Sequence, residues 1–287
     1  MIISVGPPDP TRPIPMADRI PSWQPKALIA FVVLCFGWTW GLLWVGATFT
    51  LQPQWVGTVI MTASAFGPSL AGVITVALFD GPLGLKRWIK QCLLWRIGWG
   101  WYAIAAFAPL SIMVSALALH AAMGGTVPPS PAAGSLWLSA LIFGQILLLG
   151  GPLGEEFGWR GYALPALTHG VGWRWASLVV GSVWALWHLP LFFIPGMAQA
   201  NMPMALFMAS SVALSVIFAR LSVNTRFSVL PAIVLHWSVN AGSWAIPVTP
   251  HGGVMLPYYL VMGLLFIFAV LVFLNPGPVP SKESPRE

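Results

Sequence analysis

Long apolar runs recur along the whole chain, and short segments rich in turn-forming residues separate them. A helix that crosses a bilayer needs about 20 predominantly apolar residues, and proline and glycine mark breaks such as Gln52-Pro53 and Pro195-Gly196. The pattern predicts an all-α polytopic membrane protein of about eight transmembrane helices. The expected spans are 27–49, 55–79, 99–120, 135–162, 173–195, 203–221, 228–248 and 254–274.

The composition supports a bilayer environment. Hydrophobic residues make up 57% of the 287 positions and charged residues 7%, whereas a soluble domain carries about 25% charged residues. An unusually apolar soluble protein fits poorly, because the apolar runs repeat at span length. The two cysteines, Cys35 and Cys92, show no metal-ligand spacing and are expected to be packing residues.

The basic residues fall in one set of alternating connections. The tails and the connections after spans 2, 4 and 6 carry them, and the other connections carry none. The positive-inside rule then predicts that both termini are cytoplasmic. The net charge of +6 is therefore explained by the orientation of the protein in the membrane, and no nucleic-acid partner is expected. The thirteen basic residues are Arg12, Arg19, Lys26, Lys86, Arg87, Lys90, Arg96, Arg160, Arg174, Arg220, Arg226, Lys282 and Arg286.

The chain divides into one membrane domain and two tails. Residues 1–26 are rich in proline and predict a disordered cytoplasmic tail, and residues 275–287 predict a second cytoplasmic tail. Residues 27–274 are expected to form a single transmembrane helical domain, because the first apolar run is too long for a signal peptide. Residues 83–96 mix basic and apolar side chains and predict an amphipathic helix at the membrane interface.

Two adjacent carboxylates, Glu155 and Glu156, lie within an apolar run. A charge in that position is costly and marks a candidate functional site. Glu156 and Arg160 are four residues apart and share a helical face, so the arginine is expected to neutralise this glutamate. Glu155 points about 100° away and is expected to stay free to act. A purely structural ion-pair cluster at the end of the fourth span is the alternative.

Two histidines also lie inside expected spans. His188 shares a helical face with Trp184, and His236 shares one with Asn240. Two donors on one face suit the stabilisation of a developing oxyanion, and an interhelical hydrogen-bonded pair is the alternative. The remaining histidines, which lie at span ends or in loops and are expected to be solvated or interfacial, are His120, His169 and His251.

These polar residues predict hydrolysis of a carbonyl bond without a covalent nucleophile. A carboxylate and a histidine can hold and deprotonate a water. No cofactor is favoured, and the alternative is one divalent metal such as zinc held by His188, His236 and Glu155. Counting about 1.5 Å per residue places His188 about 20 Å deeper than Glu155. The site therefore requires a helix break at Pro152 or a deeper fourth span.

Three motifs in this order resemble those of the CPBP family, which contains type II CAAX prenyl endopeptidases and bacteriocin-processing or immunity proteins and is also called Abi. The family pattern E-E-x-x-x-R matches at Glu155, Glu156 and Arg160. The pattern F-x-x-x-H matches at His188, with tryptophan at position 184 where the family usually has phenylalanine. The pattern H-x-x-x-N matches at His236 and Asn240, and the resemblance covers about residues 135–245.

The resemblance implies an intramembrane endopeptidase with a metal-free glutamate mechanism. It implies that Glu155 is the general base, that His188 is its partner, and that His236 and Asn240 form the oxyanion hole. Glu156 and Arg160 would support them.

The expected partners are the lipid bilayer and a peptide or protein substrate, whose lipidation stays open. The expected location is a bacterial plasma membrane, with the endoplasmic reticulum as the alternative. A non-catalytic immunity or binding protein and a proton-coupled transporter that uses Glu155 as a relay are the competing functions.

Overall fold

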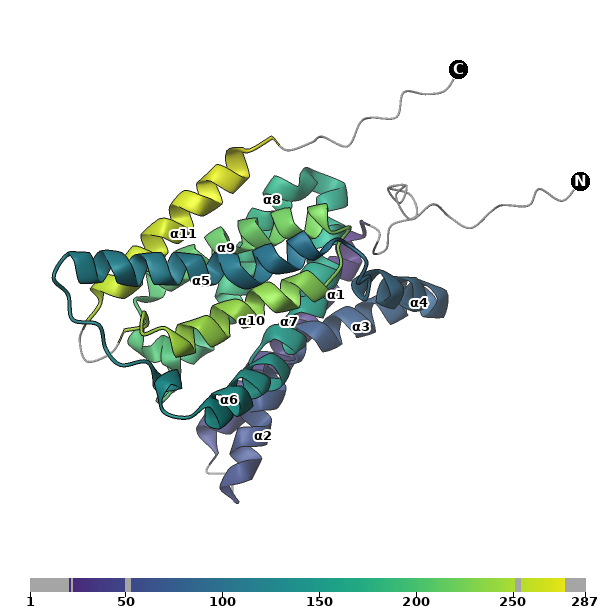
Figure 1. Cartoon of the computed structure of the whole chain (residues 1–287). Helices are drawn as coiled ribbons and strands as arrows, with labels where there is room; N and C mark the ends of the chain where they lie inside the picture. Colours follow the sequence, from purple (N-terminus) through teal and green to yellow (C-terminus); the bar gives the residue numbers. More distant parts are fainter. Residues whose placement is uncertain (1–20, 22, 50–52, 251–253, 277–287) are drawn as a thin grey trace, which may run out of the picture.

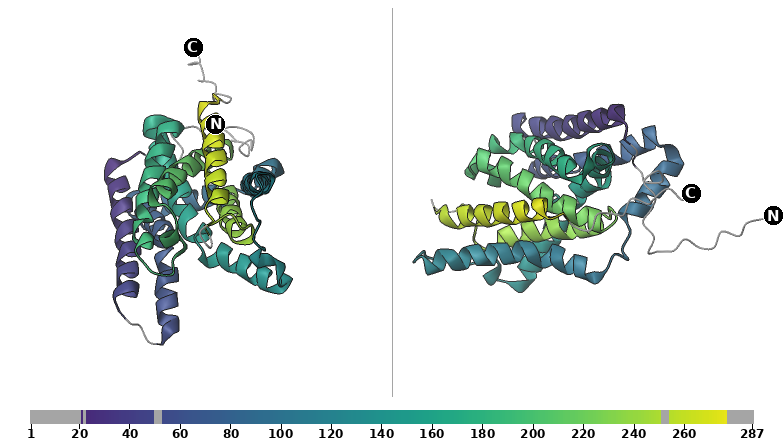
Figure 2. Two further views of the ribbon diagram at one scale, coloured as in Figure 1. Left: turned by 90° about the vertical axis from the view of Figure 1, so that its left-hand side faces the viewer. Right: turned by 90° about the horizontal axis from the view of Figure 1, so that it is seen from above.

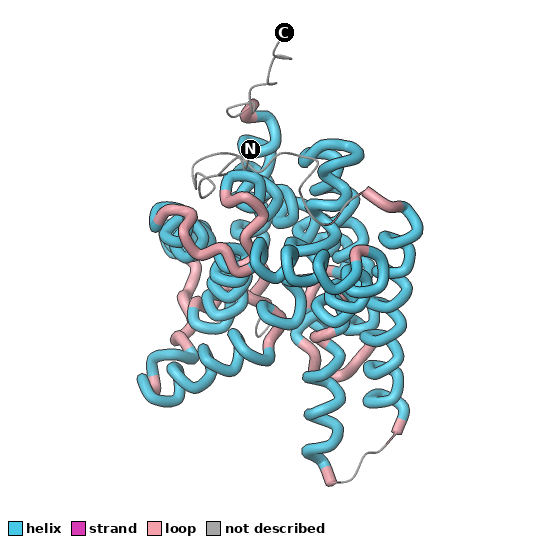
Figure 3. The backbone as a smooth tube through the Cα atoms, turned by 90° about the vertical axis from the view of Figure 1, so that its right-hand side faces the viewer, coloured by secondary structure: helices cyan, strands magenta, loops and turns pink. Residues whose placement is uncertain are grey.

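The protein is described here from a computed structural model, which covers residues 21, 23–49, 53–250 and 254–276. Most of the two expected tails, 1–26 and 275–287, lies outside these residues. Helices joined by short loops dominate the described chain, as the sequence predicts (Figures 1 and 3). The elements are α1 (Pro25–Thr48), α2 (Gln54–Ser64), α3 (Gly67–Phe79), α4 (Gly81–Cys92), α5 (Trp99–Ala122), η2 (Pro131–Ala133), α6 (Leu136–Leu149), α7 (Pro152–Gly158), η3 (Trp159–Ala163), α8 (Leu164–Trp187), η4 (Leu189–Phe192), η5 (Ala198–Asn201), α9 (Met204–Asn224), α10 (Leu230–Ala245) and α11 (Leu256–Leu274).

Several of these helices are long and apolar enough to cross a membrane. Among the described residues, five helical stretches meet that test, and the bent pair α2–α3 brings the number to six if it is one span. One of the five, Leu136–Trp187, contains two of the expected spans in its 52 residues. Helix α10 has 16 residues, fewer than a typical span of about 20. A polytopic α-helical membrane protein is thus confirmed, and the count of eight stays a prediction.

The bundle has α1 at one edge and α5 at the opposite edge, with the other long helices between them (Figure 2). Helix α8 packs along α9, α10 packs along α5, and α11 contacts both α5 and α9. Helix α3 lies between α1 and α7. The main core gathers large side chains from these helices around η3, including Phe31, Trp159, Tyr162, Phe218 and Leu235.

Helix α4 confirms the expected amphipathic segment but ends at Cys92 instead of residue 96. Lys86, Arg87 and Lys90 are exposed, whereas Trp88 is buried. The Trp88 indole Nε1–H donates to the carbonyl of Gly161, 2.8 Å away. One face of α4 therefore anchors the π-helical turn η3, and the other presents its cations.

The expected fourth span is broken, as the sequence predicts. Helix α6 ends at Leu149, and Gly151 has a φ of 111°, a left-handed conformation that favours glycine. Helix α7 then begins at Pro152, whose ring suits the first turn of a helix. The break leaves α6 projecting from the bundle while α7 turns into its centre (Figure 1).

Helix α7 reaches the centre because its glycines let the backbone of α3 come close. A Cβ at Gly154 would overlap the carbonyl of Ala65, and a Cβ at Gly158 would overlap the backbone of Pro68. Such small residues allow tight contact between helices in a membrane. The pair α3–α7 is therefore fixed by backbone contact.

Replacing Gly158 with alanine is expected to destabilise the fold, because the new methyl group meets the backbone of Pro68. Gly144→Ala is the matched control, since a Cβ at this position on α6 meets no atom within 4 Å. Thermal unfolding in detergent is expected to show a lower midpoint for Gly158→Ala and a midpoint close to wild type for Gly144→Ala. Equal midpoints for the two variants would contradict the tight α3–α7 contact.

Candidate active site

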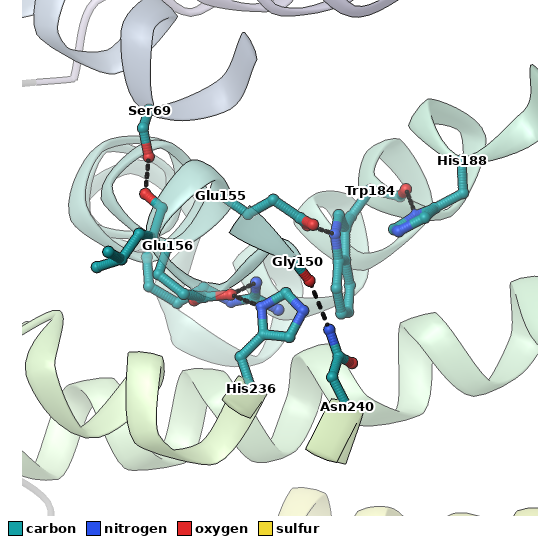
Figure 4. A network of polar contacts seen from close by, with 10 residues as sticks. Ser69, Gly150, Glu155, Glu156, Trp184, His188, His236 and Asn240 are labelled. Carbon is teal, nitrogen blue, oxygen red and sulfur yellow. Dashed lines mark hydrogen bonds and ion pairs between the residues drawn. The ribbon is translucent and has the colours of Figure 1, made fainter. Parts of the chain in front are cut away.

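The sequence-predicted polar residues converge on the break between α6 and α7 (Figure 4). Helix α7 and the turn η3 carry the two glutamates and the arginine, the end of α8 carries one histidine, and α10 carries the histidine–asparagine pair. All are buried except the asparagine, which is partly exposed. The convergent residues are Glu155, Glu156, Arg160, His188, His236 and Asn240.

The Glu156 carboxylate forms the expected ion pair and one further contact. Its Oε1 lies 2.8 Å from Nη1 of Arg160 and 2.7 Å from Nδ1 of His236. The Arg160 guanidinium also lies over the rings of Phe218 and Trp184, 3.6 Å and 4.4 Å from their centroids. Charge pairing and cation–π contacts thus compensate the burial of this arginine.

The Glu155 carboxylate points away from this ion pair and toward α8 (Figure 4). Its Oε2 accepts a hydrogen bond from the indole Nε1–H of Trp184, 2.6 Å away. The residue is 4% exposed and lines a large cavity. Trp184 thus occupies one of the two oxygens of the glutamate that is expected to stay free to act.

His188 lies on the other side of the Trp184 ring from Glu155 (Figure 4). Its Nδ1 is 2.8 Å from the carbonyl oxygen of Trp184. A carbonyl only accepts hydrogen bonds, so Nδ1 carries the proton and Nε2 of the neutral ring is an acceptor. The imidazole packs edge-on against Trp187 and Phe207. His188 is therefore held in one orientation at the cavity wall.

Gly151, Glu155 and His236 line one part of this cavity, here called the gap at Gly151. A Cβ at Gly151 would lie 2.7 Å from Oε1 of Glu155 and 3.4 Å from Nε2 of His236. Both atoms lie close to this one point, so they are no more than about 6 Å apart. Two hydrogen bonds of about 2.7–3.2 Å span up to about 6 Å, so this upper limit is compatible with a water shared by the two atoms.

Asn240 contacts the end of α6. Its Nδ2 donates to the carbonyl of Gly150, 2.9 Å away. Asn240 and His236 therefore reach the same helix break from one face of α10, as their spacing predicts, but they contact different partners. The Asn240 bond satisfies a carbonyl at the C-terminus of α6 that has no partner within the helix.

The site opens on a cavity of about 1300 Å³. This volume exceeds the roughly 300–1000 Å³ of a typical small-molecule pocket. Glu155, His188, His236 and Asn240 line one part of the cavity, and mainly apolar side chains of α9 and α11 line another. The apolar lining includes Leu214, Ile217, Val261, Leu265 and Phe268.

The alternative metal ligands do not gather into one cluster. Within residues 21, 23–49, 53–250 and 254–276, no group of three or more His, Cys, Asp or Glu side chains is placed to hold a metal ion. His188 and His236 each use Nδ1 in a hydrogen bond with another group, which leaves Nε2 as the nitrogen that could bind a metal. Glu155, His188 and His236 are thus not gathered as one ligand set among the described residues.

Sequence reasoning missed two features of the site. It assigned Trp184 to packing beside His188, whereas the indole N–H contacts Glu155. The replacement of phenylalanine by tryptophan in the family motif was the available signal, because it adds a donor. It also gave Gly151 no role, and nothing in the sequence indicates which side chains face it.

The fold and the site together define a polytopic α-helical membrane protein with a buried glutamate–histidine site. Residues 135–242 match the family described as type II CAAX prenyl endopeptidase Rce1-like. A CAAX prenyl protease 2 from Methanococcus maripaludis is 27% identical over 173 residues, which are 58% of this chain and 62% of that relative. Over this segment the chain is similar to the CAAX protease family, and the matched segment contains every candidate site residue.

The two adjacent glutamates are expected to differ in their effect on stability. Glu156→Gln removes the charge that faces buried Arg160, and breaking such a buried pair costs about 3–5 kcal/mol. Glu155→Gln is the matched control, since Glu155 forms no ion pair with Arg160 or His236. Denaturant unfolding in detergent micelles is expected to show a large decrease in the free energy of unfolding for Glu156→Gln and little change for Glu155→Gln. Similar decreases in both variants would refute the inference that only Glu156 stabilises the fold.

Proposed function

We propose that this protein is an intramembrane endopeptidase in which Glu155 activates a water molecule for attack on a peptide bond. The observation that carries the proposal is the gap at Gly151, which Oε1 of Glu155 and Nε2 of His236 both face. The match of residues 135–242 to the type II CAAX prenyl endopeptidases supports the reaction class. The competing immunity-protein and transporter functions are not favoured by this match.

The proposed reaction needs no covalent intermediate. Glu155 takes a proton from the water, and the resulting hydroxide attacks the carbonyl carbon of the peptide bond. The tetrahedral intermediate collapses as Glu155 returns the proton to the leaving amine. The products are one new carboxylic acid and one new amine, which exchange a proton to become a carboxylate and an ammonium ion, and Glu155 ends in its starting protonation state.

The family resemblance and the geometry of the site favour different histidines as the partner of Glu155. The resemblance implies His188, whose Nδ1 bonds the backbone carbonyl of Trp184, while the indole of the same tryptophan bonds Glu155. His236 faces the same gap as Glu155, so we propose that His236 shares the water. His188 and Asn240 line the cavity and are proposed to contact the scissile carbonyl.

We propose a lipidated peptide or protein as the substrate. The relative from Methanococcus maripaludis is named a CAAX prenyl protease. The alignment spans 62% of that relative, so its activity is carried over only as part of this proposal. The volume of the cavity and its apolar lining from α9 and α11 support a substrate that carries an apolar chain.

We further propose eight spans with both termini in the cytoplasm of a bacterial cell. Each of the eight expected segments coincides with one or more helices or helix pairs, including the bent pair α2–α3. The confinement of basic residues to alternating connections supports the orientation.

The purified protein is expected to cleave a quenched, lipidated peptide, and Glu155→Gln is expected to abolish cleavage while keeping the fold. A strong chelator is expected to leave the wild-type rate unchanged, since the proposed mechanism uses no metal ion. Loss of cleavage with the chelator would instead support a metal held by His188, His236 and Glu155. Undiminished cleavage by Glu155→Gln would refute the proposed base.

Gly151→Ala is expected to lower the turnover number at least tenfold, because its methyl group would fill the gap between Glu155 and His236. Gly172→Ala is the matched control. Gly172 also has a positive φ, 78°, but a Cβ there meets no atom within 4 Å. Both variants carry backbone strain, so their rates are compared per folded molecule. Equal rates would show that the gap at Gly151 has no part in the reaction.

A further inference from the structure

We propose that Trp184 is a positioning residue that selects which oxygen of Glu155 faces the reacting water. This inference rests on the proposed role of Glu155 as the base. The indole Nε1–H donates to Oε2 of Glu155 at 2.6 Å, and both side chains are 4% exposed. The indole has one donor and no acceptor, so it can engage only one of the two oxygens.

The consequence of this bond is a fixed carboxylate plane. The terminal torsion of a glutamate is broad and nearly two-fold, so an unrestrained carboxylate samples many orientations. With Oε2 held by Trp184, Oε1 is the oxygen that faces the gap at Gly151. A base must lie within hydrogen-bond reach of the proton that it takes, so this orientation matters for the rate.

Trp184 can fix Glu155 because its own ring is held on several sides. The guanidinium of Arg160 lies 4.4 Å from the ring centroid. The rings of His188, His236 and Phe218 meet it edge-on at centroid distances of 5.4, 5.9 and 6.0 Å. Its backbone carbonyl also accepts from Nδ1 of His188. One side chain thus contacts groups from α8, α9, α10 and η3 and holds Glu155 relative to all of them.

The hydrogen bond can be separated from the packing by one substitution. Trp184→Phe keeps an aromatic ring and removes the donor, and phenylalanine is the residue that the resembled motif carries here. Trp88→Phe is the matched control, because it removes another buried indole donor, which bonds the Gly161 carbonyl. Both variants lose one buried hydrogen bond, but only one of these bonds ends on Glu155.

Trp184→Phe is expected to lower kcat about tenfold relative to Trp88→Phe, the size typical of a hydrogen bond to a charged group. KM is expected to stay within about twofold, because the indole holds the base and not the substrate. The acidic limb of the kcat–pH profile is expected to move to higher pH, since the ionised carboxylate loses a donor. Equal kcat values and equal pH profiles in the two variants would overturn the proposal.

A second measurement does not need any cleavage. In protein labelled with ¹⁵N at tryptophan, the Trp184 indole signal is the one that disappears in Trp184→Phe. Glu155→Gln is expected to shift this signal, because the acceptor changes from a carboxylate to an amide, and to leave the Trp88 signal in place. An unmoved Trp184 signal would overturn the proposed contact. A wild-type protein that cleaves nothing would instead count against the proposed function alone.

Discussion

The structure depends on the burial of an ionic network at the centre of a bundle of apolar helices. The Glu156 carboxylate, 0% exposed, bonds both Arg160 and His236. A charge in this environment is tolerated only with partners, and these partners come from the turn η3 and helix α10. The network therefore joins α7 and η3 to α10, with 80 residues separating Glu156 from His236, and it fixes the orientation of His236.

The helix break at Gly150 and Gly151 allows two adjacent glutamates to have different surroundings, one in the ionic network and one at the candidate site. It turns α7 into the bundle, so that one glutamate meets Arg160 while its neighbour faces the cavity. The positive φ of Gly151 permits the turn, and the absence of a side chain there leaves space beside Glu155. Asn240 bonds the carbonyl that the break exposes. One local irregularity thus places a carboxylate and a histidine together on the wall of the cavity.

The sequence predicts much of this arrangement because the physical rules involved are local. Apolar run length predicts the helices, and the four-residue spacing of Glu156 and Arg160 predicts their ion pair. The contact between Trp184 and Glu155 was not predictable in this way, since it joins residues 29 apart and depends on how α8 packs against the turn η3 that follows α7. The position of His236 beside Gly151 likewise depends on how α10 packs, and helical periodicity gives only the face on which His236 lies.

The central claim is that Glu155 directs water onto the peptide carbonyl without itself forming a bond to the substrate. A single turnover in ¹⁸O-labelled water, followed by mass spectrometry of the product and of the digested enzyme, tests this claim most directly. The account predicts that the new carboxylate of the product carries the label and that the peptide containing Glu155 does not. Label in the Glu155 side chain with an unlabelled product would show covalent catalysis by Glu155 and would contradict the account.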